Sequence, residues 1–278
     1  MEESYCVFVN TTDRFEDCWV PFFRLFTIYW PNFKGKIYLN TEYKEFHYPG
    51  LNIISVQNCL ITNDADRITW SECLIRGLNK ITNDVVLYMQ EDYFFNSSVD
   101  NGLIENYSKF LNDNNIHCLH LTTASGGAPY TDTMYPGLKS VGKYAKYRIS
   151  CQAALWKKEV LLSYVRSHES PWQFEKYASK RAQILNHNFL AIDEKYHNGN
   201  IIMPYVLTGI IQGKWKEEVV PLFEKYQIVV DFSKRGFFTE SDERSVLTRI
   251  KTRSPKLYKE FLSYIDLVKL WFNNLLKK

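Results

Sequence analysis

Apolar runs and helical patterns alternate along the first hundred residues. Four short apolar runs predict buried strands at 5–9, 36–40, 52–56 and 84–95, the last of which runs into an acidic loop. Between them, apolar positions recur at helical spacing from Trp19 to Ile28 and across 66–81. Strands that alternate with helices in this way predict βαβ units around a mostly parallel sheet. Such sheets bind ligands at the carboxyl ends of their strands, where the polar segments 10–13 and 90–92 fall.

The second half of the chain is less regular. We expect a helix at 101–113, a strand at 117–123, a long loop at 124–143, a strand at 147–156, a helix at 157–165, a helix opened by Ser170–Pro171, and a closing loop and strand at 196–210. The pattern as a whole predicts an α/β fold with a central mixed, mostly parallel sheet flanked by helices. One domain is expected over 1–240, followed by a helical extension over 241–278.

Composition narrows the class of protein. The net charge of +3 is too mild to indicate a nucleic-acid partner. Six cysteines are dispersed without any C-x-x-C pair, which favours buried, reduced thiols and a cytoplasmic location. Glu2 and Glu3 precede the first strand, so we expect no signal peptide, and no run of 18 apolar residues predicts a membrane span.

The segment VVLYMQEDYFF, at 85–95, carries the most informative chemistry. A buried run ends in adjacent acids, Glu91 and Asp92, and aromatic residues follow at once. Carboxylates at a strand end suit Mg²⁺ or Mn²⁺, which commonly bridges the diphosphate of a nucleotide to the protein. The alternative is a solvated acidic turn after a core strand.

Three segments together resemble a known family. YCVFVNTTDR, DRITWSECLIRGL and VVLYMQEDYFF, in this order, resemble the nucleotide-binding half of GT-A fold glycosyltransferases of bacterial surface polysaccharide (lipopolysaccharide or capsule) biosynthesis. The resemblance implies a Rossmann-like catalytic domain, with a nucleotide-sugar half at about 1–123 and an acceptor half at 124–240. It also implies a UDP-sugar donor and a divalent metal ion, Mn²⁺ or Mg²⁺.

The acidic motif of the family is D-x-D, and this chain departs from it. Gln90 stands in place of the first acid, so the sequence here is Gln90-Glu91-Asp92. By resemblance, Asp92 ligates the metal directly, while Gln90 and Glu91 contact the donor. The neutral Gln90 brings the dependence on metal into question. His197 is implied as a further metal ligand, and its alternative is a solvated loop histidine.

Residues after the first strand are implied to bind the donor nucleotide. The resemblance assigns Thr11, Thr12 and Asp13 to the uracil and ribose, although Thr12 or Asp13 would also serve as a helix N-cap. Arg67, at the start of the next helix, would pair with the diphosphate in a bidentate manner. Its alternative is an exposed arginine at a helix start.

A second constellation lies in SCQAALWKKEVLLSYVRSHESPWQFE, at 150–175. In inverting GT-A enzymes, as the resemblance suggests, a carboxylate removes the proton of the acceptor hydroxyl, and an aromatic residue before it stacks on sugar. Glu175 matches the base, Trp172 the acceptor platform, and Glu169 is the nearest competing carboxylate. The alternative is a capping box of Ser170 and Gln173, with Glu175 as a first-turn acid favoured by the helix dipole.

The C-terminal segment differs in charge from the rest. Residues 244–278 contain nine bases and two acids, a net charge of +7. Within it, apolar residues recur at helical spacing: Leu257, Phe261, Ile265, Val268, Trp271, Phe272 and Leu275. A basic amphipathic helix with Trp and Phe favours an anionic membrane surface. The alternative is a helix packed on the catalytic domain with its basic face in solvent.

These features predict a hexosyltransferase. It would move a sugar, with galactose or galactofuranose as the guess, from a UDP-sugar to a hydroxyl of a glycan or lipid-linked saccharide, with inversion. It would work in the cytoplasm, at the inner face of the membrane. Gln90 keeps open a non-catalytic carbohydrate-binding or nucleotide-sugar-binding protein on the same scaffold. A sugar nucleotidyltransferase is disfavoured because no Gly-rich basic loop follows the first strand.

Overall fold

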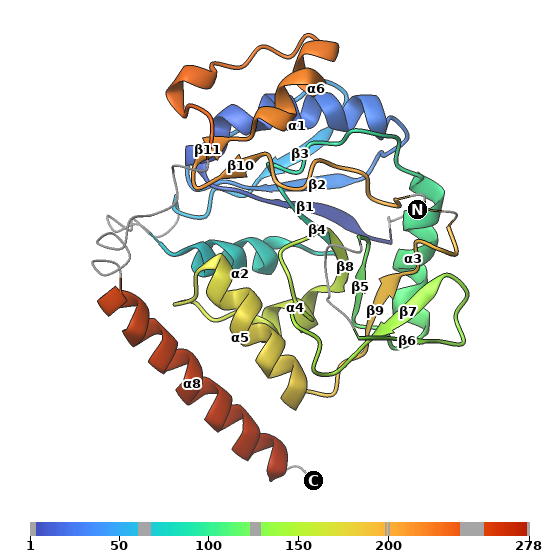
Figure 1. The fold of residues 1–278 in the computed structure, drawn as a ribbon, viewed down its shortest axis with the longest axis vertical. Coiled ribbons are helices and arrows are strands. Elements are labelled where there is room, and N and C mark those ends of the chain that lie inside the picture. The colour runs from blue at the N-terminus through green and yellow to red at the C-terminus, as the bar shows by residue number, and fades with distance from the viewer. Residues whose placement is uncertain are drawn as a thin grey trace.

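The computed structural model describes residues 4–60, 68–122, 129–197, 199, 201–239 and 253–276. Its centre is a nine-stranded sheet in the order β3-β2-β1-β4-β8-β5-β9-β7-β6, with helices on both faces (Figure 1). The expected α/β fold with a mixed, helix-flanked sheet is therefore confirmed. The expected domain boundaries, at 123/124 and 240/241, lie outside the described residues.

The first half of the sheet is parallel throughout. It consists of β1 (Cys6–Asn10), β2 (Lys36–Asn40), β3 (Asn52–Ser55) and β4 (Val85–Gln90). The 3₁₀ turn η1 (Asp13–Phe15) leads into α1 (Glu16–Tyr29), and α2 (Trp70–Lys80) precedes β4. The register pairs Asn10 with both Asn40 and Gln90, so three amide side chains lie side by side where these strands end.

The second half mixes directions. β8 (Ala154–Lys157) runs antiparallel to both neighbours, β4 and β5 (Cys118–His120). β9 (Phe189–Ile192) pairs parallel with β5, and β7 (Leu138–Val141) and β6 (Tyr130–Asp132) complete the edge in antiparallel pairs. β6 and β7 fall where a loop is expected at 124–143, and of the strand expected at 147–156 the structure keeps only its end, as β8.

Two apolar layers cover the two faces of the sheet. Along β1, Val7 and Val9 belong to the cluster under α1 and α3 (Asn101–Asp113), while Cys6 and Phe8 belong to the cluster under α2, α4 and α5. This alternation is what a strand buried on both faces requires. The helices α4 (Lys158–Tyr164) and α5 (Pro171–Ile184) follow β8 along the chain.

The remaining chain returns to the first half of the molecule and packs beside α1. A short hairpin, β10 (Ile210–Ile211) and β11 (Lys214–Trp215), is followed by η2 (Glu217–Val219), α6 (Val220–Lys225) and η3 (Phe232–Lys234). The strand expected at the end of 196–210 is thus reduced to β10. The long helix α8 (Arg253–Leu275) then lies along α5 (Figure 1). None of the described helices is long and apolar enough to cross a membrane.

Candidate active site

A cavity of about 1570 Å³ opens at the carboxyl ends of β1 and β4. Most of its lining comes from four parts of the chain: the residues after β1, the residues after β4, the first two turns of α5, and the loop 208–213. Trp70, Cys151, Gln152 and Arg235 also line it. Two residues of α8, Lys259 and Glu260, complete its wall. The sequence places polar side chains after both strands, and the parallel pairing of β1 with β4 brings them to one edge.

Amide side chains form the floor between β1 and β2. Asn40 Nδ2 donates to Asn10 Oδ1 at 2.7 Å, and Asn58 Nδ2 donates to Asn40 Oδ1 at 2.6 Å. Asn10 Nδ2 in turn donates to the Tyr88 hydroxyl at 3.3 Å. Gly77 of α2 admits this chain of amides, because a Cβ atom there would lie 2.2 Å from Asn40 Oδ1. The network fixes Asn10 at the cavity floor.

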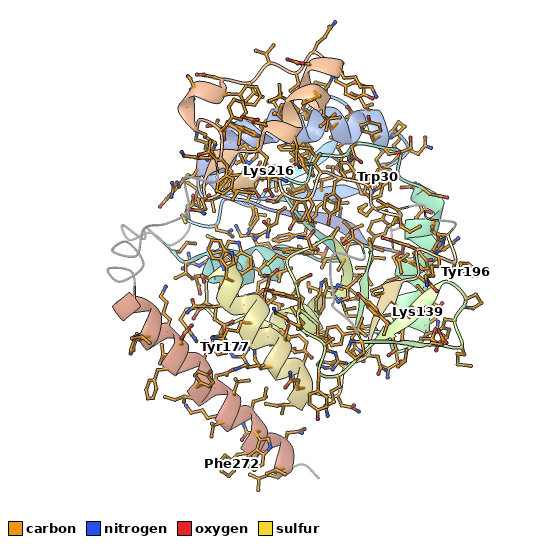
Figure 2. All side chains as sticks on the ribbon, in the orientation of Figure 1. Trp30, Lys139, Tyr177, Tyr196, Lys216 and Phe272 are labelled. Atoms are coloured by element: carbon orange, nitrogen blue, oxygen red, sulfur yellow. The ribbon has the colours of Figure 1, made fainter. Side chains whose placement is uncertain are left out.

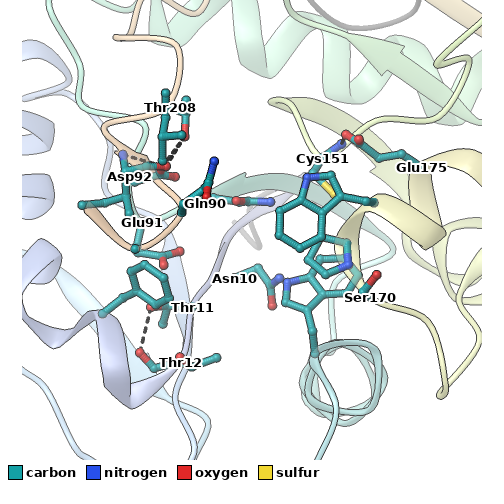
Figure 3. Close-up of a pocket in the computed structure, with 18 of the residues that line it drawn as sticks. Asn10, Thr11, Thr12, Gln90, Glu91, Asp92, Cys151, Ser170, Glu175 and Thr208 are labelled. Carbon is teal, nitrogen blue, oxygen red and sulfur yellow. Dashed lines mark hydrogen bonds between the residues drawn. The ribbon is translucent and has the colours of Figure 1, made fainter. Parts of the chain in front are cut away.

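The acidic pair after β4 lies on one side of the cavity, and both residues are only 6% exposed (Figure 3). Asp92 Oδ2 accepts hydrogen bonds from Thr208 Oγ1 at 2.5 Å and from the Ile210 backbone N–H at 3.2 Å. Asp92 Oδ1 is buried and has no hydrogen-bond partner among the described residues. The loop 208–213 therefore orients one carboxylate oxygen, while the other is buried without a hydrogen-bond partner in the described part of the chain.

Burial raises the pKa of both carboxyl groups. The pKa of Glu91 lies well above its usual value, first because of desolvation and then because of the neighbouring Asp92 charge. Desolvation also raises the pKa of Asp92, while its hydrogen bond from Thr208 opposes the rise. Two buried acids side by side are costly when both are ionised, and a bound cation would offset that cost.

Asp92 and Glu91 suit a metal ion that takes most of its ligands from water and from substrate phosphates. Within the described ranges no group of three or more His, Cys, Asp or Glu side chains is placed to hold a metal. Mg²⁺ is commonly bound by one or two carboxylates together with water and substrate phosphates. Asp92, with its unpartnered buried oxygen, and the adjacent Glu91 fit this type of site.

His197 is excluded from it. Its Nε2 lies 3.2 Å from the hydroxyl of Tyr107 on α3, and it packs beside Gly137. His197 is not among the described residues that line the cavity. The expectation that it completes a metal shell at Asp92 is therefore corrected by its packing against α3.

The residues after β1 divide into two groups. Thr11 and Thr12 line the cavity, and Thr12 Oγ1 is buried without a hydrogen-bond partner in the described part of the chain. Thr11 Oγ1 accepts a hydrogen bond from Trp19 Nε1 at 2.9 Å, which fixes its orientation. Neither threonine caps η1 or α1 through its side chain as far as the structure describes them.

Asp13 belongs to the scaffold. Its carboxylate accepts hydrogen bonds from the backbone N–H groups of Glu42 at 2.9 Å, Tyr43 at 3.0 Å and Lys44 at 3.2 Å. It is not among the described cavity-lining residues. Asp13 therefore ties the loop after β1 to the loop after β2, which corrects its assignment to the donor. Arg67 lies outside the described residues.

Two arginines that were not among the predicted site residues lie on this side. Arg14 and Arg235 both line the cavity. Arg235 donates to both oxygens of Asp17 at 2.6 Å, and its guanidinium lies 4.7 Å from the centre of the Phe15 ring. Arg235 lies more than two hundred residues from Asp17 and Phe15 in sequence, so no local pattern indicates these contacts.

The opposite wall of the cavity comes from α5. Glu175 Oε1 accepts a hydrogen bond from the Cys151 backbone N–H at 2.8 Å, and burial raises the pKa of the Glu175 carboxyl. Trp172 lines the same wall and is 72% exposed. The capping box is present as well, because Ser170 and Gln173 exchange hydrogen bonds at 3.4 and 3.0 Å. The cap fixes the start of α5 and leaves Glu175 on the cavity wall.

Glu169, six residues earlier, is removed from the cavity. Its side chain is fully buried and bonded to Arg181 at 2.9 and 2.6 Å, and it accepts a hydrogen bond from Ser263 at 2.9 Å. Glu169 is not among the described lining residues. A carboxylate held by a buried arginine is unable to reach an acceptor, so its catalytic assignment is corrected.

The cavity therefore has two chemically distinct sides (Figure 3). Thr11, Thr12, Glu91 and Asp92 lie on one side, and Glu175 lies beside Cys151 on the other. Gln90 and Asn10 lie between them. One side suits an anionic ligand with a cation, and the other presents a single carboxylate.

Comparison with known proteins gives distant matches. No protein-family profile and no curated protein sequence matches the chain. Among solved structures, S. aureus TarS 1-349 is 13% identical, covering 97% of this chain and 81% of that one, with a TM-score of 0.47. UDP-glucose pyrophosphorylase complexed with UDP-glucose is 9% identical, covering 69% and 90%, with a TM-score of 0.44.

A third match is to mannosyl-3-phosphoglycerate synthase from Rubrobacter xylanophilus, at 10% identity and a TM-score of 0.32. It covers 56% of this chain, which spans about half (54%) of that synthase. At such scores the similarity is partial, and the architecture described above stands on the strand order of this chain.

Proposed function

We propose that this protein is a glycosyltransferase of the GT-A type that moves a sugar from a UDP-sugar to a hydroxyl group of a glycan. The observation that carries the proposal is the cavity at the ends of β1 and β4. It has the buried pair Glu91 and Asp92 on one side and Glu175 on the other.

The donor would bind on the side of β1 and β4. Thr11 and Thr12 would contact the nucleoside, and Gln90 and Glu91 the ribose or sugar. Arg14 carries a positive charge on the same cavity wall and suits the diphosphate. Asp92 would hold Mn²⁺ or Mg²⁺, which supplies Lewis-acid stabilisation of the leaving diphosphate when it is bound.

Glu175 would act as the base that removes the proton from the acceptor hydroxyl. The raised pKa of this carboxyl makes the carboxylate a stronger proton acceptor than an exposed glutamate. Its hydrogen bond from Cys151 N–H fixes one oxygen, Oε1. Trp172, exposed on the first turn of α5, would give the acceptor sugar an apolar face. A separate base on the wall opposite the donor favours inversion.

The biological setting follows from the resemblance of the sequence. We propose a role in bacterial surface polysaccharide synthesis, with galactose or galactofuranose as the sugar and a lipid-linked saccharide as the acceptor. The enzyme would be cytoplasmic, working at the inner face of the membrane. Helix α8 is the part of the chain that would contact the membrane.

Calorimetry of UDP binding tests the donor site. UDP should bind the wild-type protein more tightly with Mn²⁺ than without it. Asp92→Asn should remove most of that enhancement, because losing a ligand or its support typically costs ~10–100-fold in metal affinity. Asp132→Asn, at an exposed acid on β6, is the matched control and should bind UDP as the wild type does. If UDP fails to bind while another nucleotide binds, the donor assignment is wrong.

The second candidate is a non-catalytic protein that binds a nucleotide sugar or carbohydrate. Gln90 favours it, because a neutral amide stands where the family has its first acid. The two candidates differ in turnover: a binding protein would retain UDP-sugar intact in the presence of Mn²⁺, whereas a transferase would release UDP.

A further inference from the structure

The long helix α8 is attached to the domain by its polar side. Asp266 accepts a hydrogen bond from Arg166 at 2.7 Å, and its other oxygen lies 3.5 Å from Arg181. Ser263, fully buried, donates to Glu169 at 2.9 Å and lies 2.9 Å from His168 Nε2. The centre of α8 therefore contacts the buried ion pair formed by Glu169, just before α5, and Arg181, on α5.

Both ends of the contact are polar as well. Near its start, Glu260 pairs with Lys176 of α5 at 3.3 Å. Near its end, Asn274 Nδ2 donates to the Ile184 carbonyl at 3.2 Å. The acids of residues 244–278 are Glu260 and Asp266, and both are engaged against the domain.

The opposite side of α8 is apolar and faces outward. Leu257, Phe261, Val268, Trp271, Phe272 and Leu275 are each 48–60% exposed. Their spacings are three, four or seven residues, apart from the adjacent Trp271 and Phe272, so they form one stripe along the helix. Phe272 lies near the C-terminal end of α8, on the side away from the body of the molecule (Figure 2). This stripe, defined by the six residues above, is called the outer face of α8.

Charge indicates what covers the outer face. By sequence, residues 244–278 carry nine bases against two acids, and both acids, Glu260 and Asp266, are paired with the rest of the domain. If a second copy of the chain packed here, two segments of the same positive net charge would face and repel each other. An anionic lipid surface is attracted to this charge, and Trp and Phe favour the boundary between headgroups and acyl chains.

We infer that α8 docks the protein on an anionic bilayer through its outer face, and that this docking places the cavity mouth next to the lipid surface. Lys259 and Glu260 belong to α8 and line the cavity, so the docking helix is also a wall of the active site. The second part of the inference rests on the proposed function: a glycan acceptor carried on lipid would reach Trp172 and Glu175 along the membrane plane. The acceptor class is therefore an amphiphile with its saccharide at the headgroup level.

Vesicle sedimentation of the full chain tests the inference. The probes are phosphatidylcholine vesicles and phosphatidylcholine vesicles that contain phosphatidylglycerol. The wild type should partition ~10-fold or more in favour of the anionic vesicles at low salt, and the preference should fall in 1 M salt as charges are screened. The variant Phe261→Ser/Trp271→Ser/Phe272→Ser should lose ~10-fold or more of that binding, because it loses the apolar part of the attachment.

A matched triple variant controls for the loss of exposed apolar surface elsewhere. Met134→Ser/Tyr144→Ser/Tyr147→Ser changes three exposed side chains outside α8 and should bind anionic vesicles as the wild type does. Light scattering of the same samples should show monomers. UDP calorimetry should give equal affinities for all three proteins, since none of the substituted residues lines the described cavity.

Three results overturn the inference. They are a wild type that ignores anionic vesicles, an outer-face variant that binds them as the wild type does, and a wild-type dimer that the outer-face variant dissociates. The last would assign the face to a second copy. Failure of UDP to bind any of the proteins is a different result, because it removes the proposed function and leaves the vesicle data standing.

Discussion

Glu169 and Glu175 lie six residues apart and have opposite environments. The sequence around them predicts a capped helix start and two candidate carboxylates, and it cannot separate them. What separates them is non-local: Arg181 and Ser263 hold Glu169 in the interior, whereas the Cys151 N–H holds Glu175 at the cavity. The same reason explains Asp13, whose three backbone donors come from the loop after β2.

Glu175→Gln keeps the size of the side chain and removes its ability to accept a proton. Turnover of a UDP-sugar with acceptor should fall ~10²-fold or more, the usual effect of losing a general base. UDP affinity, measured by calorimetry, should not change. Glu159→Gln, at an exposed glutamate of α4, should keep full turnover. Near-normal turnover in Glu175→Gln would show that Glu175 is not the general base.

The pH profile of the wild type gives an independent test of the same residue. Glu175 acts as a base only when it is ionised, and burial raises its pKa above the ordinary glutamate value. The rate should therefore rise with pH through a midpoint above that value, and the raised pKa should appear in kcat for the bound enzyme. A rate that is flat down to the ordinary range of glutamate would contradict the raised pKa.

Arg181→Met should destabilise the fold without entering the chemistry. It leaves the buried Glu169 charge unpaired, for which we expect a loss of ~3–5 kcal/mol in the free energy of unfolding. The double variant Glu169→Leu/Arg181→Met should recover much of that loss in urea denaturation, because no unpaired charge remains. If Glu169→Gln instead abolished turnover at unchanged stability and unchanged UDP affinity, Glu169 would be catalytic after all.

At the scale of elements, the sequence predicts the first half of the sheet well. β1, β2 and β4 have continuous apolar runs because they are buried, and α1 and α2 have clear helical spacing because they are amphipathic. β6 and β7 are missed because Tyr130–Asp132 is polar and partly exposed, and an edge pair of this kind is held mainly by backbone hydrogen bonds. α8 is predicted as amphipathic, but the side it turns outward follows only from its partners on α5.

The loop 208–213 gives a prediction at this scale. Thr208, which adopts a positive φ of 56°, donates to Asp92 across 116 positions of sequence. Thr208→Val keeps the shape and removes this hydrogen bond, so the carboxylate is less well oriented. The Mn²⁺-dependent gain in UDP affinity should fall ~10-fold, as for other residues that support a metal ligand. Thr133→Val, at a threonine of the β6–β7 turn, is the control; an unchanged gain in Thr208→Val would contradict the role of the loop.

For the molecule as a whole, two histidines connect stability to pH: the buried His120 of β5 and the half-buried His117 just before it. Burial lowers the pKa of His120, which lies 3.0 Å from the Arg148 carbonyl, to about 4, and that of His117 likewise to about 4. In the unfolded chain both would titrate near 6.5. Because the unfolded state binds more protons between these values, the folded state should lose stability as pH falls from 6.5 towards 4.

Urea denaturation at several pH values between 7.5 and 4.5 measures this loss. His117→Gln, at the more accessible of the two, should flatten the dependence without abolishing folding, whereas His47→Gln, at an exposed histidine, should not. A pH dependence that is the same in His117→Gln as in the wild type would contradict the lowered histidine pKa, because the raised carboxyl pKa values of Glu91, Asp92 and Glu175 affect both proteins equally.

The central claim is that the cavity between Asp92 and Glu175 transfers sugar from a nucleotide. Its most direct test is the release of UDP from a set of UDP-sugars with Mn²⁺, without added acceptor, where water takes the place of the hydroxyl. The wild type should release UDP from at least one of them, and Glu175→Gln should release it ~10²-fold more slowly while binding the same sugar nucleotide. Tight binding of a UDP-sugar by the wild type with no release of UDP would contradict the claim and establish a binding protein instead.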